Sequence, residues 1–368
     1  MSIFIDFHVL QTVPPSCVNR DDTGSPKTAV YGGTVRARVS SQAWKRAIRK
    51  EFAENLFSRE DLAVRTLDVV ELIQRHMLEI DGTLDPADCR KKAEKALEGA
   101  GLTLKTEKKK KTEKDETTAK ALFFMSYKQA RALAECALNM DLDAKETKEI
   151  LKDAVMQKTN PSVDIALFGR MVADDKALNC DAAAQVAHAI STHAVQNEFD
   201  YFTAVDDLKK DESTGAGHLG TVEFNSATLY RYATVNASEL VNTIGKESVA
   251  ETVRKFGQAF ICSMPTGKQN TFANRTLPDF VYVTIRKDQP INLSGAFEAP
   301  VKKSDAGYAE ASRQRLEDYA EKVYSRFAAP PDKAFYTGES FGEHAVCLSR
   351  EALMEQLEQA VNAALDEV

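Results

Sequence analysis

Residues 17–50 read CVNRDDTGSPKTAVYGGTVRARVSSQAWKRAIRK. This stretch holds eight Lys or Arg residues against two carboxylates, Asp21 and Asp22, so its local charge is +6. The whole chain of 368 residues has a net charge of −7. Because the rest of the chain is acidic, the concentration of cations predicts a specific site for an anion rather than a general affinity for nucleic acid.

The first half of this stretch predicts a strand. Residues 34–39, TVRARV, alternate along the backbone, and successive side chains of a strand point to opposite faces. One face is expected to carry Val35, Ala37 and Val39, and the other Arg36 and Arg38.

The second half predicts a helix that begins at Ser40 or Ser41. Its apolar stripe comprises Trp44, Ala47, Ile48 and Phe52. Its cations are spaced four residues apart, as Lys45 with Arg49 and Arg46 with Lys50. Like charges at this spacing destabilise an isolated helix slightly, so a bound polyanion explains them better than folding does. The alternative is a solvated basic helix that balances acidic patches elsewhere. Ser40, Ser41 and Gln42 add neutral donors beside the free N–H groups of the helix start.

The remaining chain predicts an α+β fold. Residues 2–11, SIFIDFHVLQ, indicate a half-buried strand, and residues 58–159 are mostly helical in pattern. We expect a strand at 163–168, a helix from Asp181 to about Gln196, and a long hairpin around the polar tip 211–217. A strand at 280–286 lies among helices near 239–262, 308–328 and 350–367. A ferredoxin-like or RRM-like core with a helical insertion accommodates this order most simply.

Composition favours a soluble cytoplasmic protein of roughly two domains. The six cysteines are scattered and form no C-x-x-C pair, which indicates reduced thiols and no zinc site. No apolar run approaches the roughly 20 residues needed to span a membrane. The mixed-charge run 105–115, KTEKKKKTEKD, is interpreted as a solvated loop, with an accessory nucleic-acid contact as the alternative.

Enzyme motifs are weak throughout. Residues 338–342, GESFG, match G-x-S-x-G, but only His344 follows, which is too close for a catalytic triad of that layout. His188 and His193 lie five apart, which on a helix turns them away from each other. The adjacent Asp206 and Asp207 would point to opposite faces of a strand. We therefore expect no catalytic residue, no metal and no cofactor.

Two adjacent aromatics, Tyr201 and Phe202, lie in the first arm of the expected hairpin, among acidic residues. They either fill the core of the hairpin base or stack against nucleic-acid bases. Because the neighbouring carboxylates repel phosphates, contact with RNA here would use ring faces and shape.

Six segments of the chain resemble the CasC backbone subunit family of type I-E CRISPR Cascade. The segments are SCVNRDD (16–22), GGTVRARVSSQAWKRAIRK (32–50), VDIALFGRM (163–171), AHAISTH (187–193), YFTAVDDL (201–208) and HLGTVEFNS (218–226). The resemblance extends over nearly the full chain and is most specific near the N-terminus and around 163–226.

The resemblance implies an RRM-like palm, helical fingers and a β-hairpin thumb. The palm would comprise residues 1–57 and 223–368, the fingers residues 58–193 with their return to the palm, and the thumb residues 194–222. It also implies a non-catalytic subunit that binds the CRISPR guide RNA and stacks head to tail with further copies of itself. Its other partners would be target DNA, which the guide reads by base pairing, and the other Cascade subunits.

The resemblance assigns site residues position by position. The RNA backbone would be held by Arg20, Lys27, Ser40, Gln42, Lys45, Arg46 and Arg49. Met171 and Phe202, with Tyr201 and Thr203 beside them, would lie where the thumb displaces one base of the guide. Lys302 and Lys303 fall where relatives place a lysine pair, although their spacing differs. Two other functions stay open: a metal-dependent nuclease that uses Asp206, Asp207 and His193, and a scaffold that binds only proteins.

Overall fold

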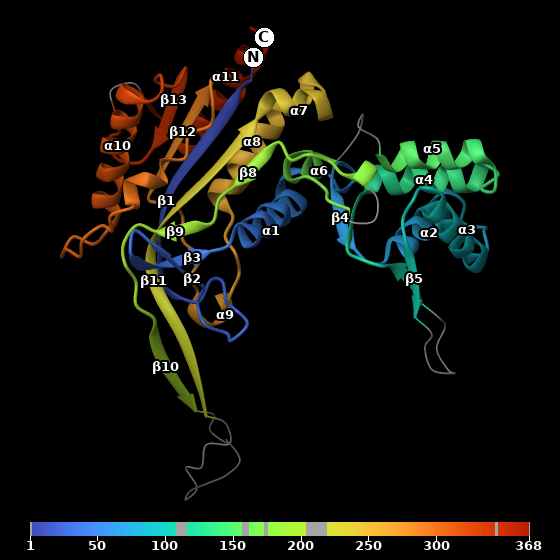
Figure 1. Cartoon of the computed structure of the whole chain (residues 1–368), viewed down its shortest axis with the longest axis horizontal. Coiled ribbons are helices and arrows are strands. Elements are labelled where there is room, and N and C mark those ends of the chain that lie inside the picture. The colour runs from blue at the N-terminus through green and yellow to red at the C-terminus, as the bar shows by residue number, and fades with distance from the viewer. Residues whose placement is uncertain are drawn as a thin grey trace, which may run out of the picture. The chain divides into compact units, whose positions relative to one another are not determined.

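The computed structural model describes residues 2–107, 116–156, 162–172, 176–203, 219–342 and 345–367. The chain forms two compact units, each with strands and helices (Figure 1), which confirms the predicted mixed α+β fold. Unit 1 comprises Met1–Glu51, Gln185–Ala237 and Val253–Val368, and unit 2 comprises Phe52–Ala184 and Ser238–Thr252. The hairpin tip 211–217, most of the run 105–115, and the residues Asp206, Asp207 and His344 lie outside the described residues.

Unit 1 is built on a sheet of ten strands. Eight follow the order β14-β13-β12-β1-β11-β9-β3-β2, and β8 and β10 also pair with β11. The strands are β1 (Phe4–Ser16), β2 (Thr28–Tyr31), β3 (Thr34–Val39), β8 (Ala184–Val186), β9 (Ala189–Ser191), β10 (Glu198–Thr203), β11 (Leu219–Asn236), β12 (Phe280–Arg286), β13 (Lys333–Thr337) and β14 (Val346–Cys347). Its helical segments are α1 (Ser41–Glu51), most of α8 (Lys246–Cys262), α9 (Gln269–Phe272), η4 (Leu293–Phe297), α10 (Ala309–Arg326) and α11 (Arg350–Asp366).

Strand β1 lies in the centre of this sheet. It pairs antiparallel with β11 on one side and with β12 on the other, so that Phe7 lies opposite both Ala233 and Val283. The predicted strand is confirmed, but its half-buried character is wrong, because Asp6 and His8 on the second face are completely buried. The alternation of apolar residues identified one face correctly, but polar residues on the other face indicated solvent where the fold has a second core.

The apolar face of β1 packs against α8. The ring of Phe7 lies 5.6 Å from that of Phe256 and 6.1 Å from that of Phe260. Gly257 allows this approach, because a Cβ atom there would lie 2.7 Å from the Phe7 ring. Each fully buried aromatic of this kind contributes about 1.5–3 kcal/mol to the free energy of unfolding.

The polar face of β1 contains a hydrogen-bonded network. The Tyr232 hydroxyl donates to Asp6 Oδ1 over 2.9 Å, and the Ile291 N–H donates to Asp6 Oδ2 over 2.9 Å. His8 Nδ1 lies 2.8 Å from the Tyr230 hydroxyl. Burial raises the pKa of Asp6 to about 6, although its hydrogen bonds oppose the shift. Burial, assisted by the charge of Arg286, lowers the pKa of His8 to about 3.

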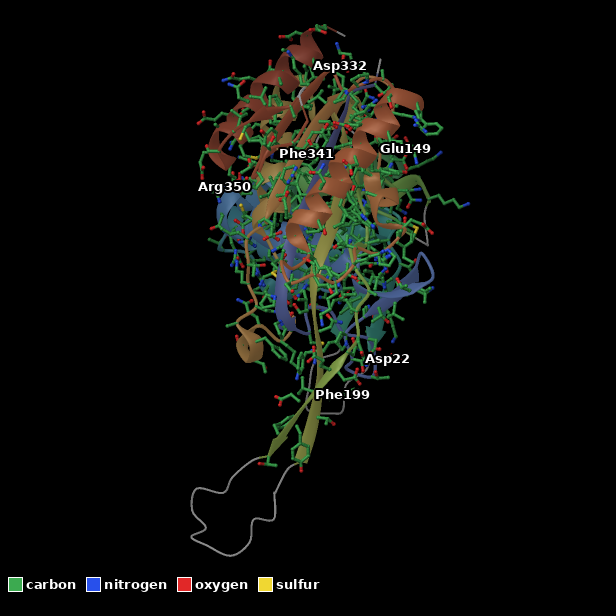
Figure 2. The ribbon with its side chains drawn as sticks, turned by 90° about the vertical axis from the view of Figure 1, so that its left-hand side faces the viewer. Asp22, Glu149, Phe199, Asp332, Phe341 and Arg350 are labelled. Atoms are coloured by element: carbon green, nitrogen blue, oxygen red, sulfur yellow. The ribbon has the colours of Figure 1, made fainter. Side chains whose placement is uncertain are left out.

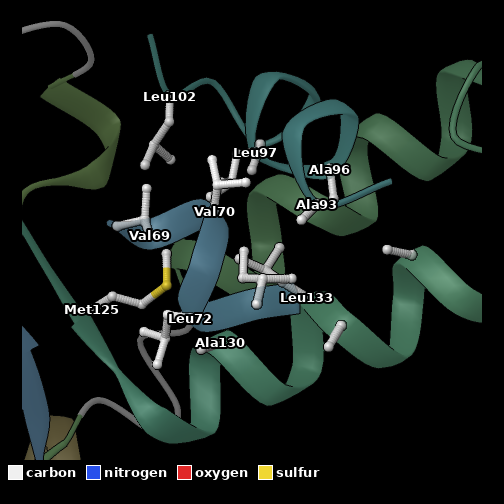
Figure 3. Close-up of a cluster of buried hydrophobic side chains, with 14 of the residues drawn as sticks. Val69, Val70, Leu72, Ala93, Ala96, Leu97, Leu102, Met125, Ala130 and Leu133 are labelled. Atoms are coloured by element: carbon white, nitrogen blue, oxygen red, sulfur yellow. The ribbon is translucent and has the colours of Figure 1, made fainter. Parts of the chain in front are cut away.

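Unit 2 is mostly helical. Its core is shown in Figure 3, where Val70 of α2, Leu97 of α3 and Leu133 of α4 meet among other fully buried side chains. Its helices are α2 (Val69–Ile80), α3 (Pro86–Gly99), α4 (Tyr127–Asn139), α5 (Lys145–Met156), α6 (Val163–Phe168) and most of α7 (Ala237–Ile244), with the shorter turns η1 (Phe52–Leu56), η2 (Arg59–Asp61) and η3 (Lys176–Leu178). Its strands are β4 (Ala63–Thr66), β5 (Leu104–Glu107), β6 (Glu116–Ala119) and β7 (Phe123–Ser126). Phe52, expected in the apolar stripe of α1, lies in η1 and stacks on Phe168.

Two predicted elements exchange their type. Residues 163–168 form helix α6 and not a strand, because the Ser162 hydroxyl caps the Ile165 N–H and Gly169 ends the turn at a φ of 75°. The predicted helix from Asp181 to Gln196 is also wrong. This segment contributes the short strands β8 and β9, whose pairing with the sheet overrides the helix propensity of alanine.

All six cysteines are free. Among the helices of the described residues, none combines the length and the apolarity that crossing a membrane requires.

Asp6 and His8 predict opposite contributions to the pH dependence of stability. The pKa of Asp6 is raised on folding, so its contribution is lost as pH rises from about 4 through 6. The pKa of His8 is lowered on folding, so its contribution is lost as pH falls from about 6.5 toward 3. When the pH falls from about 7 to 5, Asp6 raises the free energy of unfolding by about 1 kcal/mol and His8 lowers it by about 2 kcal/mol.

In the wild type, the free energy of unfolding should therefore fall slightly between pH 7 and pH 5. We expect Asp6→Asn to make this fall larger by about 1 kcal/mol, and His8→Phe to turn it into a rise. Urea unfolding measured at both pH values checks these slopes. Parallel pH profiles for both variants and the wild type would contradict the assignment.

Candidate RNA interface

Helix α1 separates its apolar and basic residues on opposite faces. An α-helix turns about 100° per residue, which groups Trp44, Ala47 and Ile48 within about 100° of arc. Those three residues are buried. On the opposite arc, also about 100° wide, lie Gln42, Lys45, Arg46 and Arg49. Gln42 and Arg46 are exposed, and Lys45 and Arg49 are half-buried. Four of the predicted RNA-binding residues therefore share one face.

Trp44 holds α1 against the sheet through Arg231 of β11. The Arg231 guanidinium lies 3.8 Å from the centre of the Trp44 ring and 4.7 Å from that of Phe260. Its Nη1 donates to Gln11 Oε1 over 2.6 Å, and its Nη2 donates to the Phe260 carbonyl. Complete burial lowers the pKa of Arg231 to about 9. Because Arg231 is fixed by strand pairing, the stacked ring fixes which face of α1 points outward.

The loop before β2 is tied to the start of α1. Asn19 Oδ1 accepts hydrogen bonds from the Ser40 N–H over 2.9 Å and from the Ser40 hydroxyl over 2.5 Å. The Lys27 N–H donates to the Asn19 carbonyl over 2.9 Å, while the Arg20 side chain is exposed. The buried Ser40 hydroxyl is thus occupied within the protein, and its observed role is to join the loop to the helix that carries Gln42.

Arg36, which the strand pattern placed on the face opposite Val35, lies in the core. Arg36 is completely buried and donates to the carbonyls of Ser191, Phe297 and Glu298. Carbonyl acceptors satisfy its donors, so it ties β3 to β9 and to η4. Val35, which precedes it in β3, is 46% exposed.

The two histidines near β9 form hydrogen bonds within the protein. The Ser41 N–H donates to His188 Nδ1 over 3.1 Å. His193 Nε2 accepts from the Thr228 N–H, and its Nδ1 lies 2.9 Å from the Ala194 carbonyl. Burial lowers the pKa of both histidines. Both ring nitrogens of His193 are therefore occupied.

Residues 198–203 and 219–224 form the predicted hairpin. Strands β10 and β11 pair antiparallel, with Tyr201 opposite Thr221 and Phe202 opposite Gly220. Side chains alternate along β10, so Tyr201 and Phe202 point to opposite faces. The Phe202 ring covers Gly220, where a Cβ atom would lie 2.3 Å from it. Thr203 shares the face of Tyr201.

Phe199 is an exposed aromatic residue of the hairpin that the sequence analysis did not single out. It lies two positions before Tyr201 on the same face, and the two rings are 67% and 63% exposed. Figure 2 shows Phe199 on the hairpin. Because side chains alternate along a strand, the two-residue spacing from Tyr201 could have placed Phe199 on the same face.

Three other predicted residues lie in separate settings. Met171 of unit 2 is 90% exposed and follows Arg170, whose buried guanidinium donates to the Leu178 carbonyl. Lys302 and Lys303 of unit 1 are both exposed. Their loop is anchored by the buried Val301 at one end and at the other by Tyr308, whose ring stacks on His193 at 3.6 Å.

Solved structures match this fold closely. One chain, described as "CRISPR RNA-guided surveillance complex, pre-nicking", matches with a TM-score of 0.84 and 35% identity, covering 97% of this chain and 100% of that chain. A second, described as "CRISPR RNA-guided surveillance complex", matches with a TM-score of 0.71 and 30% identity, covering 97% of this chain and 99% of that chain. The comparison with curated proteins gave no significant match.

The chain therefore has the fold of chains found in CRISPR RNA-guided surveillance complexes. It belongs to the CT1975-like protein family, whose model matches residues 5–363. These matches confirm the resemblance to a CRISPR backbone subunit that the sequence motifs indicated.

The stack of Trp44 on Arg231 predicts a stability effect that depends on both residues. Trp44→Ala should lower the free energy of unfolding by about 3–5 kcal/mol, and Trp44→Phe by less, because a ring remains over the guanidinium. A double-mutant cycle with Arg231→Met should give a coupling energy of about 1–2 kcal/mol. Urea unfolding followed by circular dichroism measures it, and additive losses would show that the two groups act independently.

Proposed function

We propose that this chain is a non-catalytic, guide-RNA-binding backbone subunit of a type I-E Cascade surveillance complex. One observation carries the proposal: helix α1 turns Gln42, Lys45, Arg46 and Arg49 to one face while Trp44 holds the other against the sheet. A strip of cations on a rigid element suits a phosphate backbone, because such contacts position RNA without reading its sequence. The match to chains of RNA-guided complexes at 35% identity supports the same conclusion.

The two units and the hairpin correspond to the palm, fingers and thumb of the proposed family role. Unit 1 is the RRM-like palm that carries α1, and unit 2 forms the helical fingers. The hairpin β10–β11 is the thumb. It offers Phe202 on one face and the pair Phe199 and Tyr201 on the other, and exposed rings of this kind stack on bases or wedge between them.

In the proposed assembly, copies stack head to tail along the guide RNA, in contact with the other Cascade subunits. A head-to-tail contact joins two different surfaces and need not close into a ring, so its length is set by the guide and by capping subunits. Target DNA is then read by base pairing with the guide, while the protein supplies geometry and charge.

The two alternative functions have less support. A nuclease that uses His193 would need a free ring nitrogen, whereas both nitrogens of His193 have partners within the protein. Its other proposed ligands, Asp206 and Asp207, lie outside the described residues. The function of a scaffold that binds only proteins does not account for the four polar and cationic residues that share the face of α1 opposite Trp44.

Charge reversal at two exposed cations tests RNA binding. We expect the double variant Arg20→Glu, Arg46→Glu to lose guide RNA from the complex assembled with its partner subunits, because it places carboxylates beside phosphates. The ratio of absorbance at 260 and 280 nm of the purified complex measures the RNA retained.

A matched double variant on α10, Lys322→Glu with Arg326→Glu, makes the same change in net charge at two exposed positions and should retain the RNA. Equal RNA content in both variants would remove the α1 face from the site. Degradation of the RNA by the wild-type chain in Mg²⁺ would overturn the non-catalytic assignment.

The hairpin residues test which face meets the bases. Phe202→Ala should weaken binding of single-stranded RNA by about 1–3 kcal/mol, through loss of a stacking surface. Gly220→Ala retains Phe202 but should weaken binding too, because the added Cβ would force the Phe202 ring to move. Fluorescence anisotropy with labelled RNA measures both. Phe199→Ala probes the opposite face, and a larger loss there than at Phe202 would reverse the assignment.

A further inference from the structure

Residues 266–276, the segment between α8 and β12, have a composition unlike the rest of the chain. They read TGKQNTFANRT, with two cations, Lys268 and Arg275, and no carboxylate. The remaining side chains are rich in amide and hydroxyl groups. A segment of this kind within a chain of net charge −7 is suited to an anionic partner.

The backbone of this segment is strained at two positions. Lys268 has φ 51° and ψ 24°, and Ala273 has φ 47° and ψ 42°, so both occupy the left-handed region that favours glycine. They flank the four residues of α9. Residues with a Cβ atom stay in this region only where surrounding contacts hold them, and such strain clusters at functional sites.

The contacts that hold the segment come from β1 and from the loop that carries Arg20. Gly267 lies against that loop so closely that a Cβ atom would be 2.0 Å from the Val18 carbonyl oxygen. The Thr276 hydroxyl donates to the Thr12 carbonyl over 2.8 Å. The Phe272 ring lies 5.8 Å from that of Phe224, at the base of the hairpin.

These contacts place Lys268 beside the loop that carries Arg20. Burial raises the pKa of the Cys17 thiol, and the charges of Arg20 and Lys268 oppose that shift, while those of Asp21 and Glu223 add to it in smaller measure. Both cations therefore lie within electrostatic reach of one sulfur atom. Lys268 is half-exposed and Arg20 is exposed. Among the described residues no carboxylate forms an ion pair with either, which leaves both charges available to a ligand.

We propose that Lys268, held in its left-handed conformation against the loop of residues 17–20, binds an RNA phosphate beside the one bound by Arg20. This inference rests on the proposed function and extends it. The 266–276 segment then forms a second contact strip, on a different element from α1 and adjoining the base of the hairpin.

Salt dependence of RNA binding tests the proposal. The purified full chain is titrated into labelled single-stranded RNA at several salt concentrations, and the logarithm of the binding constant is plotted against that of the salt concentration. Each phosphate neutralised on a single strand contributes about 0.7 to the slope. We expect Lys268→Gln to reduce the slope by about 0.7, and Lys268→Arg to restore the wild-type slope. The exposed Lys322→Gln on α10 makes the same change in net charge and should leave the slope unchanged.

The outcomes separate this inference from the proposed function. If the Arg20 and Arg46 reversal releases RNA but Lys268→Gln keeps the wild-type slope, the role of Lys268 is overturned and the RNA-binding function stands. If the wild-type chain binds no RNA, both are overturned. Unfolding curves of the Lys268 variants show whether a change in the salt slope comes from misfolding. A folded Lys268→Arg variant keeps the charge, and its failure to restore the slope would contradict the proposal.

Discussion

The contact on which the interface depends is the stack of the Trp44 ring on the Arg231 guanidinium. Burying a cation is costly, and here the aromatic ring, Gln11 and a backbone carbonyl provide the compensation. An aliphatic residue in place of Trp44 would leave the guanidinium with only the more distant Phe260 ring. The helix is therefore held in one rotational setting, and that setting determines where Lys45 and Arg46 point.

Strand β11 connects this anchor to the other functional features. Arg231 faces α1 from one side of the strand, while Tyr230 and Tyr232 join the buried network of Asp6 and His8 on the other. Further toward its start, the same strand leaves the sheet core and pairs with β10, where Gly220 receives the Phe202 ring. One continuous strand thus fixes the register of both the basic helix and the hairpin.

The parts of the fold that sequence predicted are those where periodicity and burial coincide. Helix α1 has a complete apolar stripe, and the hairpin has two β-prone arms, so both were predicted together with most of their site residues. The failures occur where tertiary contacts decide. Residues 163–168, VDIALF, are apolar except for Asp164, which leaves strand and helix both compatible with the pattern, and the Ser162 cap selects the helix. The alanines of 181–196 favour a helix locally, but pairing to β11 is available and determines their conformation.

Charge counting in residues 17–50 indicated a candidate site but overstated its cations. Arg36 belongs to the core, where carbonyls satisfy its donors, and Arg38 donates to the Thr28 carbonyl. Asp21 is likewise engaged, because it accepts hydrogen bonds from Thr23 and Ser25 that close its own turn. What distinguishes the site is therefore orientation more than total charge. A cation contributes to a binding face when another contact turns it outward. In α1 that contact is made by Trp44, which lies on the opposite side of the helix.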